Sequence, residues 1–489
     1  MDTPVVVIGA GLAGLAAANA LARAGERVVL VEAGDSPGGC CSTTTRDGFR
    51  FNNGAVYLAV PSLLRRGFAQ LGLDLDADVR LVGIAHPLES HLDDGTVVRL
   101  ASARDASVEG PDATARTALL QHGLERLQRQ WGPVYRILIE DILPQEPGLW
   151  HTLLRLGRYL PRMRGHVDSL IEDCFPDAGI QAAVSSTLLY SGIAPERLPV
   201  TQIIGLMALL EEGFHLPEGG MGTITDALVR RLPRADVALR LGQAVQRIDV
   251  AGGQVRGVLL AGGERVETQR VLATVSGFDV VRNLLPADAL PRRLVRVSRR
   301  APLSHRAVSI QLGCTGIPAQ GGFIVNHVPA MRRQWQMHTT QSSPPPWWAC
   351  TVPTRVLPTL ADAGKSIVEL YAPVSGIDTA SAWSPAMTEA AVRLHVEALR
   401  QRMPGLAIET MRVIDPPALA GARHLYEGAL YGIAPGTAPN HLFPHRSGIP
   451  GLYLAGQTTF PGYGVATALW SGLHASRALL DDRRKRRAG

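Results

Sequence analysis

Three glycines near the N-terminus have the spacing that binds phosphate groups. Gly9, Gly11 and Gly14 directly follow the β-branched run 5–8, and residues 12–24 are rich in Ala and Leu. A buried strand, a tight glycine turn and a helix in this order form the phosphate site of a dinucleotide fold. Gly9 permits the turn, Gly11 lets the backbone approach a pyrophosphate, and Gly14 allows the helix to pack closely on the strand. The helix N-terminus then directs free N–H groups at the phosphates.

An acidic residue after the next apolar run completes this pattern. Glu32 follows residues 27–31, which we expect to form a second parallel strand. Its carboxylate is placed to accept hydrogen bonds from ribose hydroxyls, and an acid there disfavours the 2′-phosphate of NADP. The sequence therefore predicts a dinucleotide site, with FAD and NAD both open at this point.

The residues after Glu32 favour FAD. Gly38 and Gly39 form a second glycine pair, and segment 32–39 resembles the extended motif of the flavin amine oxidase and phytoene desaturase superfamily. Many relatives have Arg after this pair, where this chain has Cys40 and Cys41. We expect Cys40 to pack beside the cofactor rather than to have a redox role. Segment 47–54 is similar to the phytoene desaturase pattern too, with Asn52 in place of the usual Asp.

A second signal lies near the C-terminus. Residues 451–457 indicate a buried strand that ends in glycine, and residues 461–466 open a helix that continues to about residue 480. In FAD enzymes a turn of this type lets backbone N–H groups meet the flavin pyrimidine oxygen and aims a helix N-terminus at the reduced ring. Many relatives have an acid where Gln457 stands. Together with residues 428–432, this stretch resembles the retinol saturase side of the phytoene desaturase, carotenoid isomerase and retinol saturase branch.

The resemblance implies cofactor contacts spread over the chain. Residues 213–222 are similar to the family segment that returns to the FAD domain, and Val245 matches a valine whose backbone meets the adenine. Relatives with covalent flavin use a cysteine near the C-terminal flavin turn. None follows Cys350, so we expect non-covalent FAD. The implied cofactor-binding residues are Gly9, Gly11, Ala13, Gly14, Glu32, Ala33, Gly38, Gly39, Cys40, Gly54, Ala55, Val245, Gly456, Gly464 and Val465.

The matching segments also imply the architecture. We expect an α/β protein with a Rossmann-like FAD-binding domain of the GR2 type, discontinuous in sequence, and an α+β substrate-binding domain. The FAD domain would take residues 1–75, 213–290 and 426–489, and the substrate domain would take residues 76–212 and 291–425. Gly252 and Gly253 predict a hairpin turn between neighbouring strands.

The substrate regions carry no family motif, but helical periodicity dominates residues 117–166. One leucine stripe is spaced by three to four residues, and later apolar residues from Trp150 to Met163 interleave with four arginines. We favour packed helices with a solvated basic face. The alternative is a peripheral contact with an anionic membrane.

The sequence contains few candidate catalytic residues. The resemblance places His215 and Tyr431 near the flavin, where either could move a proton. Four aromatic residues could line an apolar tunnel, or they could be ordinary core or surface residues: Phe323, Trp335, Trp347 and Trp348. Flavin amine oxidases often use a lysine near the ring, and only Lys365 lies inside the fold, in a turn. No metal-ligand spacing is present.

Composition and charge exclude several classes of protein. The 489-residue chain has a net charge of +6 at pH 7, and the basic run 483–487 accounts for most of it. We therefore expect no nucleic-acid partner, and we expect this run to be a solvated end outside the fold. Five cysteines argue against a disulfide framework and favour a reducing, cytoplasmic compartment, with a peripheral place on the inner membrane open. The apolar run 5–22 lacks the positive start of a signal peptide.

The function that we expect is an FAD-dependent oxidoreductase acting on C–C or C=C bonds of an extended apolar polyene or isoprenoid-like substrate. Desaturation, saturation, isomerisation and reductive cyclisation all fit, as in the bacterial natural-product pathways that use relatives of this kind. Amine oxidation is one alternative, and a non-enzymatic flavoprotein scaffold is another. A single dinucleotide fingerprint predicts no second, tight NAD(P)H unit, and it leaves the electron donor or acceptor open.

Overall fold

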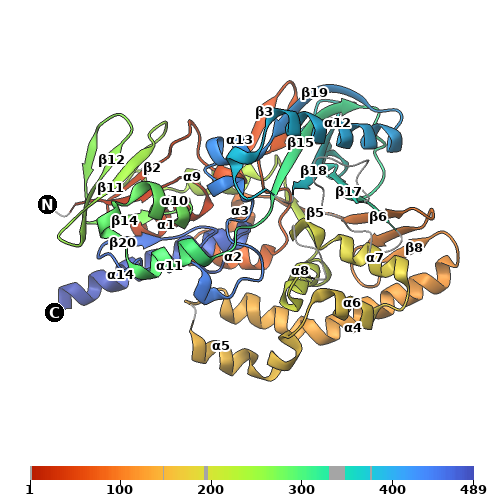
Figure 1. Ribbon diagram of the computed structural model, residues 1–489, viewed down its shortest axis with the longest axis horizontal. Coiled ribbons are helices and arrows are strands. Elements are labelled where there is room, and N and C mark those ends of the chain that lie inside the picture. The colour runs from red at the N-terminus through yellow and green to blue at the C-terminus, as the bar shows by residue number, and fades with distance from the viewer. Residues whose placement is uncertain (1–2, 147, 192–196, 330–346, 375–376, 489) are drawn as a thin grey trace.

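A five-stranded, fully parallel sheet lies at one end of the molecule (Figure 1). The structure is a computed structural model that describes residues 3–146, 148–191, 197–329, 347–374 and 377–488. The strand order is β10-β2-β1-β14-β20. The strands are β1 (Val5–Ile8), β2 (Val28–Val31), β10 (Val237–Arg240), β14 (Arg270–Ala273) and β20 (Leu452–Leu454). The structure thus confirms the predicted N-terminal and C-terminal strands and joins them in one sheet.

The helices on this sheet explain the apolar N-terminal run. Strands β1 and β2 are buried along their whole length, as expected for a parallel sheet covered on both faces. Helix α1 (Leu12–Arg23) packs against α9 (Gly222–Arg230) and α14 (Val465–Ala488). A Cβ atom on Gly472 of α14 would lie 2.1 Å from the carbonyl oxygen of Ala13. The run 5–22 is therefore a buried strand and helix, as predicted.

A small antiparallel sheet extends this end of the molecule. It consists of β11 (Val245–Ala251), β12 (Gln254–Leu260) and β13 (Arg265–Glu267). Gly252 and Gly253 have φ values of 59° and 73° and form the tight turn between β11 and β12. The predicted hairpin is confirmed.

The opposite half contains an eight-stranded sheet in which only β6 and β16 pair in parallel. Its order is β19-β15-β18-β17-β16-β6-β7-β8. The strands are β6 (Leu88–Leu92), β7 (Val97–Leu100), β8 (Ser107–Glu109), β15 (Arg306–Thr315), β16 (Ile324–Val328), β17 (Trp348–Thr351), β18 (Ser366–Val374) and β19 (Ala407–Ile414). Helix α12 (Pro385–Arg402) packs on β15 and β18.

A layer of helices lies below this sheet in the view of Figure 1. They are α4 (Ala113–Ile137), continued by a π-helical turn at Leu138–Ile142, then α5 (Leu149–Leu156), α6 (Val167–Cys174), α7 (Ala178–Ser186) and α8 (Ile204–Glu212). The predicted leucine stripe comprises Leu119, Leu120, Leu124 and Leu127. Its last three members are fully buried, but Leu119 is 39% exposed, so the prediction is wrong for Leu119. No helix in the described ranges is long and apolar enough to cross a bilayer.

Shorter elements complete the fold. They are α2 (Pro61–Gln70), α3 (Leu75–Asp78), α10 (Gly277–Asp279), α11 (Arg292–Arg300), α13 (Pro416–Ala422), β3 (Thr43–Arg46), β4 (Phe49–Asn52), β5 (Leu81–Gly83) and β9 (His215–Pro217). Each large sheet draws its strands from one of the two expected domains. We keep the predicted domain boundaries as our proposal.

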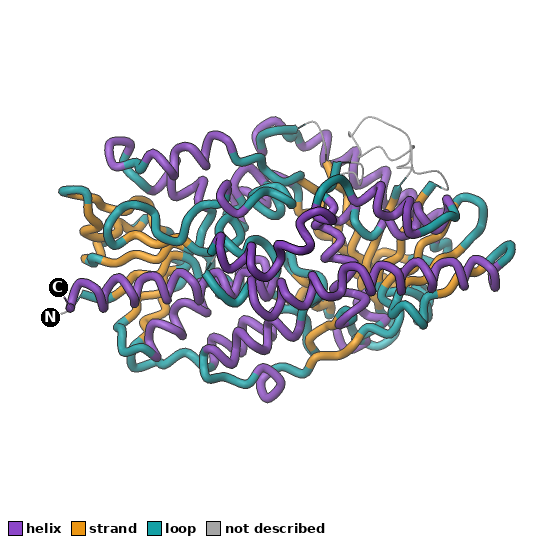
Figure 2. Tube along the Cα trace, turned by 90° about the horizontal axis from the view of Figure 1, so that it is seen from below, coloured by secondary structure: helices purple, strands orange, loops and turns teal. Residues whose placement is uncertain are grey.

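The basic C-terminal run differs from its prediction. Residues 483–487 do not follow the last helix, because α14 continues to Ala488. Arg483 forms an ion pair with Glu26, whose side chain is only 2% exposed and whose second oxygen pairs with Arg270 at 2.9 Å. A buried carboxylate needs such partners, so the start of the run belongs to the fold. The N- and C-termini both lie at the parallel-sheet end of the molecule (Figures 1 and 2).

Candidate active site and cofactor cavity

One large cavity lies between the parallel sheet and the eight-stranded sheet. Its volume is about 1820 Å³, and both halves of the chain line it. A pocket for one small molecule has about 300–1,000 Å³. The cavity therefore has room for a dinucleotide and an extended second ligand together.

The turn between β1 and α1 forms one end of this cavity. A Cβ atom on Gly11 would find no protein atom within 4 Å, so the backbone here opens into the cavity. Gly14 does not line the cavity; a Cβ there would lie 1.8 Å from the carbonyl oxygen of Gly9. Gly11 thus offers close approach to a ligand, while Gly14 keeps α1 close to its strand, as each spacing predicted.

Glu32 binds backbone N–H groups at this end of the cavity and can also bind a ribose. Its Oε2 accepts a hydrogen bond from the Ala10 N–H at 2.7 Å, and its Oε1 accepts one from the Gly34 N–H at 2.9 Å. Each carboxylate oxygen can accept two hydrogen bonds, so both retain capacity for ribose hydroxyls. Ala33 and Val245 line the cavity beside Glu32.

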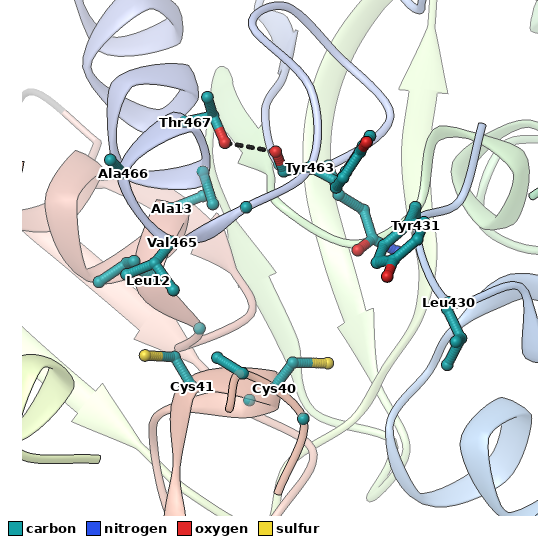
Figure 3. A pocket seen from close by; sticks show the side chains of 18 of the residues that line it. Leu12, Ala13, Cys40, Cys41, Leu430, Tyr431, Tyr463, Val465, Ala466 and Thr467 are labelled. Atoms are coloured by element: carbon teal, nitrogen blue, oxygen red, sulfur yellow. Dashed lines mark hydrogen bonds between the residues drawn. The ribbon is translucent and has the colours of Figure 1, made fainter. Parts of the chain in front are cut away.

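The other end of the cofactor wall combines distant segments (Figure 3). Gly456, Gly464 and Val465 line the cavity where α14 begins, and the Thr467 hydroxyl donates to the carbonyl of Tyr463 at 2.5 Å. Gly54 and Ala55 also line it, because the Ala55 N–H donates to the carbonyl of Cys40 at 2.9 Å.

FAD fits these residues. The open backbone at Gly11 and the free lone pairs of Glu32 would hold the ADP half. The backbone at Gly54, Gly456 and Val465 would hold the ring, beside the N-terminus of α14. Among the predicted cofactor residues, Ala13, Gly9, Gly38 and Gly39 also line the same wall.

Cys40 stands in this wall where many relatives have an arginine. Burial raises the pKa of its thiol above the usual value, and a protonated thiol is a poor nucleophile. The Cys40 and Cys41 side chains point in opposite directions (Figure 3). This environment supports the packing role that we expected for Cys40.

An arginine that sequence reasoning missed supplies positive charge at the same place. Arg423 follows α13, lines the cavity and donates from Nη1 to the carbonyl of Gly39 at 3.4 Å. It lies far from the glycine pair in sequence, so no local spacing could have identified it.

Tyr431 lies in the cavity wall, but its hydroxyl is occupied. It donates to the carbonyl of Tyr190 at 2.6 Å, and its ring stacks on Tyr463 with 4.3 Å between centroids (Figure 3). Burial raises the pKa of Tyr431 far above its usual value. The geometry therefore makes Tyr431 an aromatic wall of the cavity rather than a ready proton source.

His215 does not line the cavity, which corrects the position expected for it. It pairs through its backbone with Leu58, and it is the neighbouring Phe214 that faces the cavity and stacks on Tyr57 at 4.3 Å. The strand alternates its side chains between two faces, and this register directs His215 away from the cavity.

Three of the four aromatic residues for which tunnel lining and ordinary core were both open belong to the core. Phe323, Trp347 and Trp348 are buried, at 1 to 5% exposure, and none lines the cavity. Trp348 packs under the guanidinium of Arg402. Trp335 lies outside the described residues. The core alternative therefore holds for the three described residues.

The helical layer lines the remaining arm of the cavity with apolar side chains. The described part of residues 113–212 contributes no charged side chain to this lining. The lining includes Trp131, Val134, Leu138, Ile139, Ile142, Leu143, Leu156, Met163, Leu188, Leu198, Ile204, Leu206, Ala208 and Leu209. An elongated apolar ligand fits such a surface.

Neither lysine of the chain lines the cavity. Lys365 lies directly before β18 and pairs with Glu409 at 2.9 Å, and Lys485 is exposed near the end of α14. A carboxylic residue that we did not predict, Glu369 of β18, does line it.

Comparisons with known proteins agree with this geometry. Residues 12–310 match the family model described as flavin containing amine oxidoreductase. The chain is 29% identical to the phytoene dehydrogenase of Streptomyces griseus, over 98% of this chain and 95% of that protein. It is 28% identical to the hydroxyneurosporene desaturase of Rhodobacter capsulatus, over 99% and 98%. Its fold is similar to that of cyclohexylamine oxidase from Brevibacterium oxydans, with a TM-score of 0.64 at 16% identity, covering 99% of this chain and 100% of that one.

Proposed function

The chain belongs to the flavin containing amine oxidoreductase family, and on that premise we propose that it acts on carbon–carbon bonds of an extended apolar polyene. It is an FAD-dependent oxidoreductase. Bound FAD supplies the hydride chemistry, while the protein binds and orients the substrate and excludes water.

The observation that carries this proposal is the apolar arm of the cavity. Helices α4, α5 and α8 present it with apolar side chains and without charge in the described residues. Burial of apolar surface stabilises a bound polyene by about 25 cal/mol per Å². The relatives named phytoene dehydrogenase and hydroxyneurosporene desaturase support the same substrate class.

Amine oxidation is the second candidate, because carboxyl groups line the cavity, namely Glu32, Asp279 and Glu369. A carboxylate could pair with a substrate ammonium group. The absence of lysine from the described lining and the apolar side chains that the helical layer contributes favour the polyene.

Anaerobic mixing tests the two candidates side by side. The purified holoenzyme is mixed with phytoene in detergent, or with cyclohexylamine or putrescine, and the absorbance of oxidised flavin is followed. We expect the polyene to bleach the flavin, or an unsaturated polyene to reoxidise the photoreduced flavin if the enzyme saturates bonds. Bleaching by an amine and by no polyene would contradict the proposal.

We propose further that α5 and the turns after it contact an anionic membrane, from which the substrate enters. Trp150 and Leu154 are 78% and 83% exposed, although both are large apolar residues. The same segment contributes Thr152, Leu156 and Met163 to the cavity lining. Exposed arginines flank it, namely Arg155, Arg158, Arg162 and Arg164. An amphipathic helix of this kind binds the headgroup region.

Vesicle sedimentation tests this contact. Replacing Trp150 and Leu154 with Ser should weaken binding to vesicles of phosphatidylglycerol and phosphatidylcholine at least about tenfold, because each buried side chain contributes roughly 1.5–3 kcal/mol. The matched control is Leu241→Ser with Met411→Ser, since these residues are 37% and 42% exposed elsewhere on the surface. Equal losses in both double variants would refute the proposed surface.

A further inference from the structure

Glu369 is a buried carboxyl group in the wall of the cavity. It lies on β18 with 6% of its surface exposed, in register with Gln311 of β15 and with Thr351 of β17. All three side chains line the cavity. Buried carboxyl groups are rare unless they are paired or serve a function.

Neutral groups alone hold this carboxyl. Gln311 Nε2 donates to Oε1 at 3.1 Å, and the Thr351 hydroxyl lies 3.3 Å from Oε2. The described residues form no ion pair with Glu369. The ionisable groups on the strands packed around it are Arg50, Arg306, Cys314, Cys350 and Tyr371, and none hydrogen bonds to it; Arg412 of β19 binds Asn53 instead. Burial in this uncharged setting raises the pKa of Glu369 to about 7.

The network connects Glu369 directly to the proposed cofactor wall. Gln311 Nε2 also donates to the carbonyl of Asn52 at 2.5 Å, and Asn52 leads into Gly54 and Ala55. Gln311 Oε1 and Asn52 Nδ2 are buried and have no partner within the protein. Unsatisfied buried polar atoms are costly, so they mark a place where a bound group or water completes the network.

The network also accommodates both protonation states. An ionised Glu369 accepts hydrogen bonds from Gln311 and from the Thr351 hydroxyl. A protonated Glu369 can donate from Oε2 to the same hydroxyl, because a hydroxyl both donates and accepts. The site can therefore hold or release a proton without rearrangement of the strands.

We propose that Glu369 is the proton-transferring residue of this cavity, taking the proton that the substrate loses when a carbon–carbon bond is oxidised. In desaturation, bound FAD would supply the two-electron oxidant that accepts a hydride from one carbon, and the neighbouring carbon would give a proton to the Glu369 carboxylate. The electron pair of the second C–H bond becomes the new double bond, and Glu369 becomes a carboxylic acid. In saturation the same steps run in reverse. This inference rests on the proposed function for its substrate, but the titration of Glu369 does not depend on it.

The first experiment needs no substrate. Infrared difference spectra of the holoenzyme, recorded between pH 5 and pH 9, should show the band of a protonated carboxyl that disappears with a midpoint near pH 7. Glu369→Gln should remove this band. The matched control is Glu89→Gln: Glu89 is buried in the same sheet, but its pKa is lowered to about 2 by His91 and Arg99, so the band should remain. Burial also raises the pKa values of Asp279 and Asp226, so the loss of intensity is what counts. A band near pH 7 that keeps its full intensity in Glu369→Gln would overturn the proposal.

The second experiment measures the reaction. At polyene concentrations far below saturation, where the rate reports the substrate-free protein, flavin bleaching should become faster as the pH rises through about 7 in the natural protein. Glu369→Gln should lower it about 10²–10⁴-fold and abolish this dependence, while FAD affinity stays the same. Glu369→Asp keeps a carboxyl and should keep a pH-dependent rate, and it serves if the Gln variant does not fold. Unchanged rates in Glu369→Gln would overturn the proposal. A carboxyl that titrates in a protein that bleaches with no polyene would instead refute only the proposed substrate.

Discussion

Two truncations of the C-terminal helix should show which of its last residues stabilise the fold and which are only solvated. A chain that ends at Leu480 loses Arg483, which pairs with Glu26, and Asp482, which accepts a hydrogen bond from the Tyr453 hydroxyl at 3.0 Å. A chain that ends at Arg483 keeps both and loses the exposed Arg484, Lys485 and Arg486. The two truncations remove similar positive charge from the surface. Only the first removes an ion-pair partner of the buried Glu26 carboxylate.

The magnitude follows from the surroundings of Glu26. Its side chain is 2% exposed, so its charge is fully desolvated. Removal of every partner of a buried charge costs roughly 3–5 kcal/mol. Arg270 still pairs with it at 2.9 Å, so the loss is closer to one hydrogen bond to a charged group, roughly 1.5–3 kcal/mol. Truncation after Arg483 should change the free energy of unfolding by less than about 0.5 kcal/mol.

Urea unfolding at one saturating FAD concentration measures this difference, since bound ligand stabilises every variant by mass action. Arg483→Gln in the full chain should reproduce most of the loss seen on truncation at Leu480. Equal unfolding free energies for the two truncations would refute the structural role of Arg483, and the run 483–487 would then be the solvated end that its composition indicates.

Two further predictions concern single carboxylates. Glu32→Ala should weaken FAD binding at least about 100-fold, because hydrogen bonds to a charged group contribute roughly 1.5–3 kcal/mol each; apoprotein reconstitution followed by flavin fluorescence measures it, with the surface variant Glu264→Ala as control, and equal affinities would contradict the ribose contact. The raised pKa of Glu369, about 7 against 4.5, means that the folded state binds the extra proton. The contribution of protonated Glu369 to the free energy of unfolding is fully present below pH 4.5. It declines as the pH rises to and through 7, and the total loss is about 3 kcal/mol. Glu369→Gln should lack this decline in unfolding experiments across the same pH range.

The parts of the site that depend on local spacing were predictable from the sequence. The turn at Gly9, Gly11 and Gly14 is built from consecutive residues, and its strand and helix are fixed by an apolar run and by helix-forming composition. The same holds for the hairpin at Gly252 and for the helix that begins at Val465. In each case the residues that interact are within a few positions of each other, so their types determine the local geometry.

The parts that depend on strand pairing were not predictable in this way. Strands β15, β17 and β18 are almost entirely buried, so alternation of polar and apolar residues does not reveal their register. Only this register brings Gln311 and Thr351 to Glu369. The predicted position of His215 was wrong for the same reason, since a shift of one residue in strand register would have directed His215 into the cavity in place of Phe214. Arg423 and Arg483 reach partners that are far away in sequence, where spacing carries no information.

The position of Glu369 gives the cavity a way to couple substrate binding to proton transfer. An apolar polyene that fills the arm beside Glu369 removes water from the carboxylate, and desolvation raises the pKa of a carboxyl group further. The group therefore becomes a stronger base when the substrate is bound and can take up the proton that oxidation releases. Below its pKa the same group is an acid and can return a proton to carbon, as microscopic reversibility requires. The same two neutral partners, Gln311 and Thr351, hold Glu369 in both desaturation and saturation. The pH and the electron partner decide the direction of the reaction.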